Sequence, residues 1–227
     1  MVVKLFLISI EKYINNNFPF MERKHIPLQK QRLEAFSDGV IAIVITLMIL
    51  EIKIPEVTGN ASAGEIWNSW FNAIPLLIAY ILSFVILGVL WVNHHQFFQQ
   101  VKHIDRKLLW YNLHLLFWMC IIPLPTAFLG LHFERPEATA LYGFNMFMTA
   151  SAFALMREYV HKNEHLLIDH LSKALRKKLR IKILATVALY FISIFTGYIS
   201  IYISLGIFLL IIVIYFMPQN TVIEIKE

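Results

Sequence analysis

Two pairs of polar residues in this sequence could do chemistry, and both lie at the edges of apolar stretches. Ser37 and Asp38 precede one such stretch, and His94 and His95 follow another. A serine, an aspartate and a histidine could hydrolyse an ester, and paired histidines could bind a metal or haem. No glycine-rich nucleophile turn surrounds Ser37, and Trp91 beside the histidines favours an anchoring role at a helix end. We therefore expect no enzyme activity, no metal site and no bound cofactor.

A single hydroxyl inside the first apolar stretch indicates a different chemistry, the passage of an ion. Thr46 lies among the 12 uncharged residues from Gly39 to Leu50. At 3.6 residues per turn, one helix face carries Phe36, Gly39 or Val40, Ile43, Thr46 or Leu47, and Leu50. If several copies of this helix surrounded an axis, apolar rings could gate a pore by dewetting, and threonine hydroxyls could replace part of an ion's hydration shell. The alternative is ordinary helix packing, with the Thr46 hydroxyl bonded to its own helix.

The composition of the chain places these residues in a membrane. Of the 227 residues, 58% are hydrophobic and only 15% are charged, whereas a soluble domain carries about 25% charged residues. The net charge of +5 does not indicate a nucleic-acid partner, because the basic residues are distributed as a membrane topology requires. We therefore expect an all-α, polytopic membrane protein embedded in the lipid bilayer, with no nucleic-acid partner.

Six stretches are apolar enough to be transmembrane helices. A bilayer core about 30 Å thick needs about 20 helical residues. The predicted spans are Phe36–Pro55, Trp70–Val92, Leu108–Leu131, Ala138–Met156, Ile181–Tyr198 and Ile201–Met217, with a tight turn near Gly197–Ser200. Pro123 and Pro125 should kink the third span, because a proline cannot donate the helical hydrogen bond. The predicted domains are a cytoplasmic or interfacial extension at 1–30, a six-helix transmembrane domain at 31–218 and a cytoplasmic tail at 219–227.

The basic residues indicate how the helices are oriented. Residues 1–32 hold six Lys or Arg, 94–107 hold three, 157–182 hold eight and the C-terminus holds one, whereas the opposite side has only Lys53 and Arg135. Because cytoplasmic loops are enriched in Lys and Arg, we expect a protein of the cell membrane with both termini in the cytoplasm. The basic segment 161–182 has a second interpretation, an amphipathic surface that binds anionic lipid.

Asp38 needs a partner from another helix. Only 12 residues separate it from Glu51, a rise of about 20 Å that is shorter than the hydrocarbon core. Charges this close to the membrane interior usually face the helix bundle or a water-filled cavity, so we expect the first span to be the least lipid-facing helix. Arg32 lies about 240° away around the helix and cannot pair with Asp38 directly. The candidate donors on other helices are Trp91, His94, His95 and Asn112.

The first span carries a longer pattern, Arg32-x3-Phe36-Ser37-Asp38-Gly39-Val40-x-Ala42-Ile43-x2-Thr46-Leu47-x2-Leu50-Glu51-Ile52. This pattern resembles the first helix of prokaryotic members of the "transmembrane protein 175" family, which comprises endosomal and lysosomal potassium channels and their bacterial and archaeal relatives. Trp91-x2-His94-His95, Asn112 and Pro123-x-Pro125-Thr126 are similar to the family as well. The resemblance extends over roughly residues 30–220.

The resemblance implies a six-helix subunit that assembles as a homotetramer, with the first helices lining a potassium-permeable pore that lacks the usual filter loop. It implies that Ile43 is the hydrophobic constriction, and that Leu47 and Leu50 are further pore-lining layers. Thr46 becomes a candidate selectivity position. A structural network would anchor this helix to its neighbours. The expected members of the network are Arg32, Phe36, Ser37, Asp38, Trp91, His94, His95 and Asn112.

The predicted function is therefore passive conduction of potassium, with modest selectivity over sodium because no filter of several carbonyl groups is present. Other monovalent cations and protons are further candidates for permeation. The alternatives are a secondary transporter, a proton leak pathway and a non-conducting membrane scaffold. Against a carrier, the predicted membrane interior holds no acidic residue beyond Asp38, and no pair of broken helices in an inverted repeat is evident.

Overall fold

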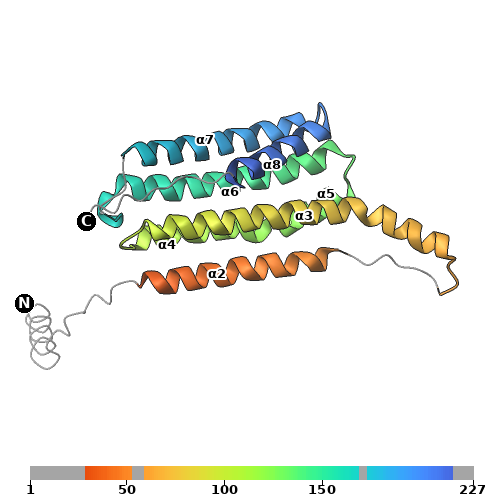
Figure 1. Ribbon diagram of the computed structural model, residues 1–227, viewed down its shortest axis with the longest axis horizontal. Coiled ribbons are helices and arrows are strands. Elements are labelled where there is room, and N and C mark those ends of the chain that lie inside the picture. Colours follow the sequence, from red (N-terminus) through yellow and green to blue (C-terminus); the bar gives the residue numbers. More distant parts are fainter. Residues whose placement is uncertain (1–28, 53–58, 169–172, 217–227) are drawn as a thin grey trace, which may run out of the picture.

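The computed structural model describes residues 29–52, 59–168 and 173–216, which form a bundle of long helices without a strand (Figure 1). In chain order the elements are α2 (Lys30–Leu47), η1 (Met48–Glu51), α3 (Ala63–Gln99), α4 (Arg106–Ile121), α5 (Pro123–Leu131), α6 (Pro136–Lys162), η2 (Glu164–Leu166), α7 (Lys173–Thr196) and α8 (Ile201–Phe216). The all-α prediction is confirmed. The predicted N-terminal extension up to residue 28 and the tail at 219–227 lie outside the described residues.

The six predicted spans correspond to six helical segments. α2 continued by η1 forms the first, α3 the second, and α4 continued by α5 the third; α6, α7 and α8 are the others. Within the described residues, four segments are long and apolar enough to cross a membrane: Lys30–Glu51, Ala63–Gln99, Arg106–Leu131 and Leu175–Thr196. α8 is strongly apolar but has only 16 residues. α6 is less apolar because it packs inside the bundle and buries polar side chains there.

Two breaks in the helices lie where the sequence predicts them. Ile122 separates α4 from α5, and α5 begins at Pro123, which has no N–H to donate. The turn between α7 and α8 occupies the predicted residues Gly197–Ser200. A Cβ atom at Gly197 would collide with the side chain of Thr139 in α6. Glycine therefore lets this turn pack closely against α6.

The second span begins earlier than predicted, at Ala63 rather than Trp70. The reason is a capping box at its N-terminus, which hydropathy alone does not reveal. The Glu65 carboxylate accepts a hydrogen bond from the backbone N–H of Ser62 at 2.7 Å, and the Ser62 hydroxyl accepts one from the Glu65 N–H at 3.3 Å. With 37 residues, α3 is about 55 Å long, and its first turns project beyond the bundle in Figure 1.

α6 is the most enclosed helix of the subunit. It packs against α4, α5, α7 and α8. Its Tyr142 is fully buried and hydrogen-bonded to Ser83 of α3 at 2.9 Å, and Ser83 accepts a hydrogen bond from Thr126 of α5 at 2.8 Å. The first span was expected to be the least lipid-facing helix, but within one subunit α2 lies at the edge of the bundle (Figure 1). It packs mainly against α3 and α4, so its outer side is not covered within the subunit.

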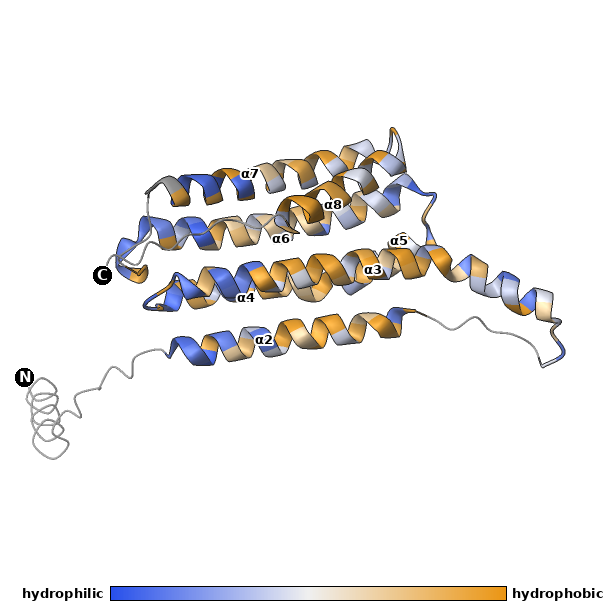
Figure 2. Cartoon of the chain, in the orientation of Figure 1, coloured by the Kyte–Doolittle hydropathy of each residue, from blue (hydrophilic) through white to orange (hydrophobic). Residues whose placement is uncertain are grey.

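Successive long segments alternate in direction, and this gathers the basic segments at one end of the bundle. α2, α4 and α7 begin at this end, whereas α3 and α6 finish there and the shorter α8 runs toward it without reaching it (Figure 1). Figure 2 shows hydrophilic residues at the same end and mostly hydrophobic residues along the middle of the helices. Arg135, just before α6, lies at the opposite end. The arrangement matches the division of Lys and Arg residues between two sides, and this end is called the basic end below.

Candidate ion pathway on the first helix

α2 has two faces that differ in character, and its inner face packs against α3 and α4. The residues buried on the inner face are Leu33, Ser37, Ile41, Val44 and, in η1, Met48. They recur every three or four residues, which places them on one side of the helix. The inner face therefore joins the core of the subunit.

The outer face of α2 carries large apolar side chains that touch little within the subunit. The exposed fractions are 52% for Phe36, 57% for Ile43, 50% for Leu47 and 72% for Leu50. Beyond the neighbouring residues and the backbone of its own helix, no atom lies within 4 Å of the position that a Cβ of Gly39 would occupy. The structure thus places all three residues predicted to line the pore on one exposed stripe, about 21 Å long from Phe36 to Leu50.

Thr46 lies on the same exposed stripe. Its hydroxyl group contacts two backbone carbonyl oxygens of its own helix, those of Ala42 at 2.9 Å and Ile43 at 3.0 Å. The hydroxyl hydrogen is therefore directed at the helix, and the oxygen lone pairs are left for a group outside it. An oxygen in this state is an acceptor, and a cation is one group that it can bind.

A buried polar network ties the inner face of α2 to α3 and α4. The Ser37 hydroxyl donates to the Leu33 carbonyl at 2.8 Å, so it can only accept the hydrogen bond from Asn112 Nδ2, also 2.8 Å long. This bond fixes the orientation of the Asn112 amide group, whose Oδ1 atom lies 2.8 Å from His94 Nε2. His94 must therefore carry its proton on Nε2. Ser37, His94 and Asn112 are all almost completely buried.

Asp38 finds its partner on α3, as expected for a carboxylate that cannot pair within its own helix. Trp91 Nε1 donates to Asp38 Oδ1 at 2.9 Å. The Trp91 ring stacks on His95, with ring centroids 6.0 Å apart, and His95 Nε2 lies 3.1 Å from the side-chain nitrogen of Gln99. This second group is more exposed than the first, since 41% of Trp91 is accessible to solvent.

Two of the eight expected network residues are not joined to the others. The Arg32 side chain is exposed and makes no ion pair or hydrogen bond with another residue that the structure describes, and Phe36 points away from the bundle. The remaining six fall into two groups: Ser37 with Asn112 and His94, and Asp38 with Trp91 and His95. Both groups hold the N-terminal half of α2.

Sequence reasoning missed other buried polar groups. Ser83, Thr126 and Tyr142 form a hydrogen-bonded chain that joins α3, α5 and α6. Arg157 was counted only as a topology charge, yet it is 93% buried, with an exposed fraction of 7%. Single hydroxyls in apolar runs have no characteristic spacing, so nothing in the sequence could have paired the first three. The sequence does contain an indication that Arg157 is buried, because this residue directly follows a predicted span and precedes the exposed part of the basic segment.

Comparison with known proteins covers the same helices. Residues 32–123, from α2 into the start of α5, match the family described as "Endosomal/lysosomal potassium channel TMEM175". A potassium channel of Chryseobacterium sp. (strain P1-3) is 36% identical over 195 residues, which are 86% of this chain and 96% of that protein. The endosomal/lysosomal proton channel TMEM175 of Rattus norvegicus is 36% identical over 108 residues, which are 45% of this chain but only 22% of that protein.

A solved structure has the same fold over nearly its whole length. The crystal structure of a lysosomal potassium-selective channel TMEM175 homologue from Chamaesiphon minutus superposes with a TM-score of 0.72 and 27% sequence identity, covering 82% of this chain and 95% of that one. The likeness therefore includes the helices beyond residue 123 as well as the first three spans. Because the sequence matches a relative over nearly its full length, and because the fold is the same, the chain belongs to the TMEM175 family of ion channels.

Proposed function

We propose that this chain is one subunit of a potassium-permeable cation channel in which several copies of α2 surround the pore. The outer face of α2 is the observation that carries the proposal: an exposed apolar stripe with one hydroxyl, on a helix whose other face is held by buried hydrogen bonds. The full-length relative and the fold relative, both named potassium channels, support potassium as the permeant ion.

Contact with lipid alone would be unfavourable for the outer face of α2. The uncharged part of the span between Asp38 and Glu51 rises about 20 Å, against a hydrocarbon core of about 30 Å. A helix of that length beside lipid would draw its terminal charges toward hydrocarbon, which costs several kcal/mol per charge. Other copies of α2 and a water-filled pore would remove this cost.

In our proposal, the side chains on the stripe have different roles in the pore. Ile43 would form the narrowest apolar ring, and Leu47 and Leu50 would form further rings toward the η1 end. Such rings hold back water and ions until they widen. The Thr46 ring would supply lone pairs between them, which favours potassium over sodium only modestly, because one layer of hydroxyls replaces a small part of the hydration shell.

The two hydrogen-bonded groups on the opposite face would keep the stripe aimed at the pore. A helix packed at the edge of its subunit can rotate or shift unless specific contacts fix it. Asn112 supplies such a contact, because breaking it would leave the buried His94 N–H without an acceptor and Ser37 Oγ with only its bond to the Leu33 carbonyl. We therefore assign these residues an anchoring role and no direct contact with the ion.

The assembly and its location are part of the proposal. The family resemblance implies four copies, a homotetramer with its pore on the axis. The gathering of Lys and Arg at the basic end supports an orientation with both termini in the cytoplasm of the cell membrane. Permeating potassium ions are the only bound species that this function needs, and we infer no catalytic activity.

Proton conduction through the same pore is the second candidate function. The observation that favours it is the match with mammalian proteins named proton channels, although the matched part is only about a fifth of their length. A secondary transporter would instead bind its substrate and move it in fixed stoichiometry with an ion.

Single-channel or macroscopic recording of purified protein in planar bilayers separates these functions. A potassium channel gives a current that reverses near the potassium equilibrium potential and does not saturate at moderate driving force. A reversal potential that follows the proton gradient would instead establish proton conduction. Where no current is found, flux into proteoliposomes decides between the remaining functions: saturable flux in fixed stoichiometry with an ion would establish a carrier, and stable oligomers without flux would leave only the scaffold.

A further inference from the structure

Arg157 is a buried cation near the C-terminal end of α6, with an exposed fraction of 7%. Its Nε and Nη2 atoms have no hydrogen-bond partner among the residues that the structure describes. Its guanidinium carbon lies 5.5 Å from the ring centroid of Phe97 and 5.8 Å from that of Phe153. Such ring contacts offset part of the cost of burying a charge, but an unpaired buried cation remains costly. The side chain therefore has unused capacity for an anion.

The two unpartnered atoms of Arg157 lie on the same edge of the guanidinium plane. Their N–H bonds are nearly parallel, and this is the fork that binds two oxygens of one carboxylate or phosphate group. No carboxylate of the residues that the structure describes occupies the fork. The nearest acidic residue on α6, Glu158, pairs instead with Arg180 at 3.2 Å and Lys162 at 3.5 Å, and Glu164 pairs with Arg176 at 2.6 Å.

Two further groups near Arg157 could contact the same anion. His161 follows it by one helical turn, and its Nε2 atom is also buried without a partner. The Lys182 ammonium of α7 lies 4.0 Å from the centroid of the Tyr215 ring of α8, a contact that a flexible lysine can exchange for an oxygen ligand. The three cationic or donor groups come from α6 and α7.

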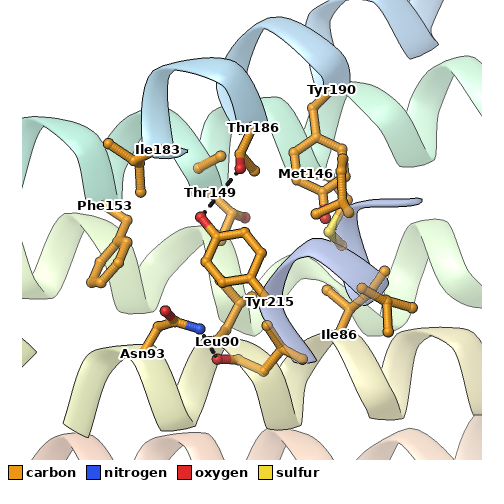
Figure 3. Close-up of a pocket in the computed structure, with 14 residues that line it drawn as sticks. Ile86, Leu90, Asn93, Met146, Thr149, Phe153, Ile183, Thr186, Tyr190 and Tyr215 are labelled. Atoms are coloured by element: carbon orange, nitrogen blue, oxygen red, sulfur yellow. Dashed lines mark hydrogen bonds between the residues drawn. The ribbon is translucent and has the colours of Figure 1, made fainter. Parts of the chain in front are cut away.

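The location favours phosphate over carboxylate. A cavity of about 30 Å³ lies between α3, α6, α7 and α8, next to Arg157 but not lined by it. Phe153 of α6 and Tyr215 of α8 are among its lining residues (Figure 3), and the Tyr215 hydroxyl accepts a hydrogen bond from Thr186 at 3.2 Å. Arg157 follows Phe153 by one turn toward the basic end, five residues before α6 ends at Lys162. It therefore lies about 8 Å from the end of the helix, and basic pockets between transmembrane helices near their cytoplasmic ends are a recurrent type of site for lipid phosphate groups.

We propose that Arg157, together with Lys182 and His161, forms a binding site for a phosphate group at the basic end of the bundle, between α6, α7 and α8. The group is the headgroup phosphate of an anionic lipid or a free phosphate. Membrane topology alone does not explain the site, because the positive-inside tendency is met equally well by exposed lysines such as Lys177 and Lys178. A buried fork with unpartnered donors is what a phosphate oxygen pair requires.

The test measures binding to the purified full-length protein in a neutral detergent. Native mass spectrometry counts bound lipid after titration with dioleoylphosphatidylglycerol, and thermal unfolding is followed in parallel with inorganic phosphate. The variants are Arg157→Gln, Arg157→Lys and Lys182→Gln. Lys177→Gln is the matched control, because it removes the same charge from an exposed position on α7.

We expect saturable binding to the wild type and at least roughly tenfold weaker binding to Arg157→Gln, because charge-assisted hydrogen bonds are lost. Arg157→Lys should be intermediate, since it keeps the charge and loses the fork, and Lys177→Gln should bind like the wild type. Stabilisation by inorganic phosphate that depends on Arg157 identifies free phosphate as the ligand; binding of the lipid alone identifies the headgroup.

Two results would overturn the site: no saturable binding of either probe to the wild type, or equal weakening by Lys177→Gln and Arg157→Gln. If Arg157→Gln fails to yield a folded oligomer, Lys182→Gln decides the question against the same control. Weaker binding to Lys182→Gln supports the site, and unchanged binding contradicts it. Binding is measured without ion flux, so the result is independent of the proposed channel function.

Discussion

Replacing Asn112 with alanine should destabilise the subunit more than most single changes, because Asn112 bridges two buried groups. The variant removes the hydrogen bond to Ser37 Oγ and the one from His94 Nε2, both 2.8 Å long. Ser37 keeps its bond to the Leu33 carbonyl, so losing the Ser37–Asn112 bond should cost about 1 kcal/mol of stability. The buried His94 N–H would be left without an acceptor, which should cost about 1–3 kcal/mol more. We therefore expect the free energy of unfolding to fall by roughly 2–4 kcal/mol.

The assay for this prediction is thermal or denaturant unfolding of the purified oligomer in detergent, with Asn93→Ala as the matched control. Asn93 lies on α3 and donates only to a carbonyl of its own helix, at 2.7 Å. The Asn93→Ala substitution should therefore lower the free energy of unfolding by less than about 1 kcal/mol. Equal stability of the Asn112→Ala and Asn93→Ala proteins would refute the idea that the buried network anchors α2.

Three further changes test other parts of the structure. Thr46→Val keeps the shape of the side chain and removes the hydroxyl, and should lower the potassium-to-sodium permeability ratio about fivefold if that hydroxyl contributes about 1 kcal/mol; bi-ionic reversal potentials measure this ratio. Gly130→Ala would place a Cβ 2.6 Å from the α3 backbone and should cost roughly 1–3 kcal/mol of stability, whereas Gly88→Ala, which meets no atom within 4 Å, should cost little. Trp91→Phe removes the bond to Asp38 and should destabilise less than Asn112→Ala, because the half-exposed carboxylate can bind water instead; a larger loss would contradict the assignment of the buried group as the main anchor.

The fold was largely predictable because hydropathy and proline placement act locally. Charge-free stretches defined the six spans, Pro123 marked the break in the third, and Gly197 marked the turn in the last hairpin. The start of α3 was predicted seven residues too late, since a capping box rather than apolar character begins the helix at Ala63. Local signals of this kind need no knowledge of what packs where.

The two faces of α2 were predictable for the same reason, because helical periodicity alone places Ile43, Thr46 and Leu50 on one side. The partners of the other side were only partly predictable. Trp91, His94, His95 and Asn112 were the candidate donors for Asp38, and of these Trp91 bonds it, whereas Asn112 bonds Ser37 instead. Which donor meets Ser37 and which meets Asp38 depends on how three helices are rotated against one another. The enclosed position of α6 was likewise invisible, since it follows from packing between segments far apart in the sequence.

The most direct test of the central claim, that α2 lines a cation pathway, is potassium efflux from proteoliposomes that contain the wild type or Ile43→Asn. Ile192→Asn is the control, because Ile192 is similarly exposed at 48% but lies on α7, away from the proposed pore. A polar side chain in the apolar ring should let water and ions pass more readily. We predict wild-type efflux that Ile43→Asn increases several-fold and Ile192→Asn leaves unchanged. Intact oligomers with no efflux in any variant, or an equal increase with both, would contradict the assignment of α2 as the pore helix.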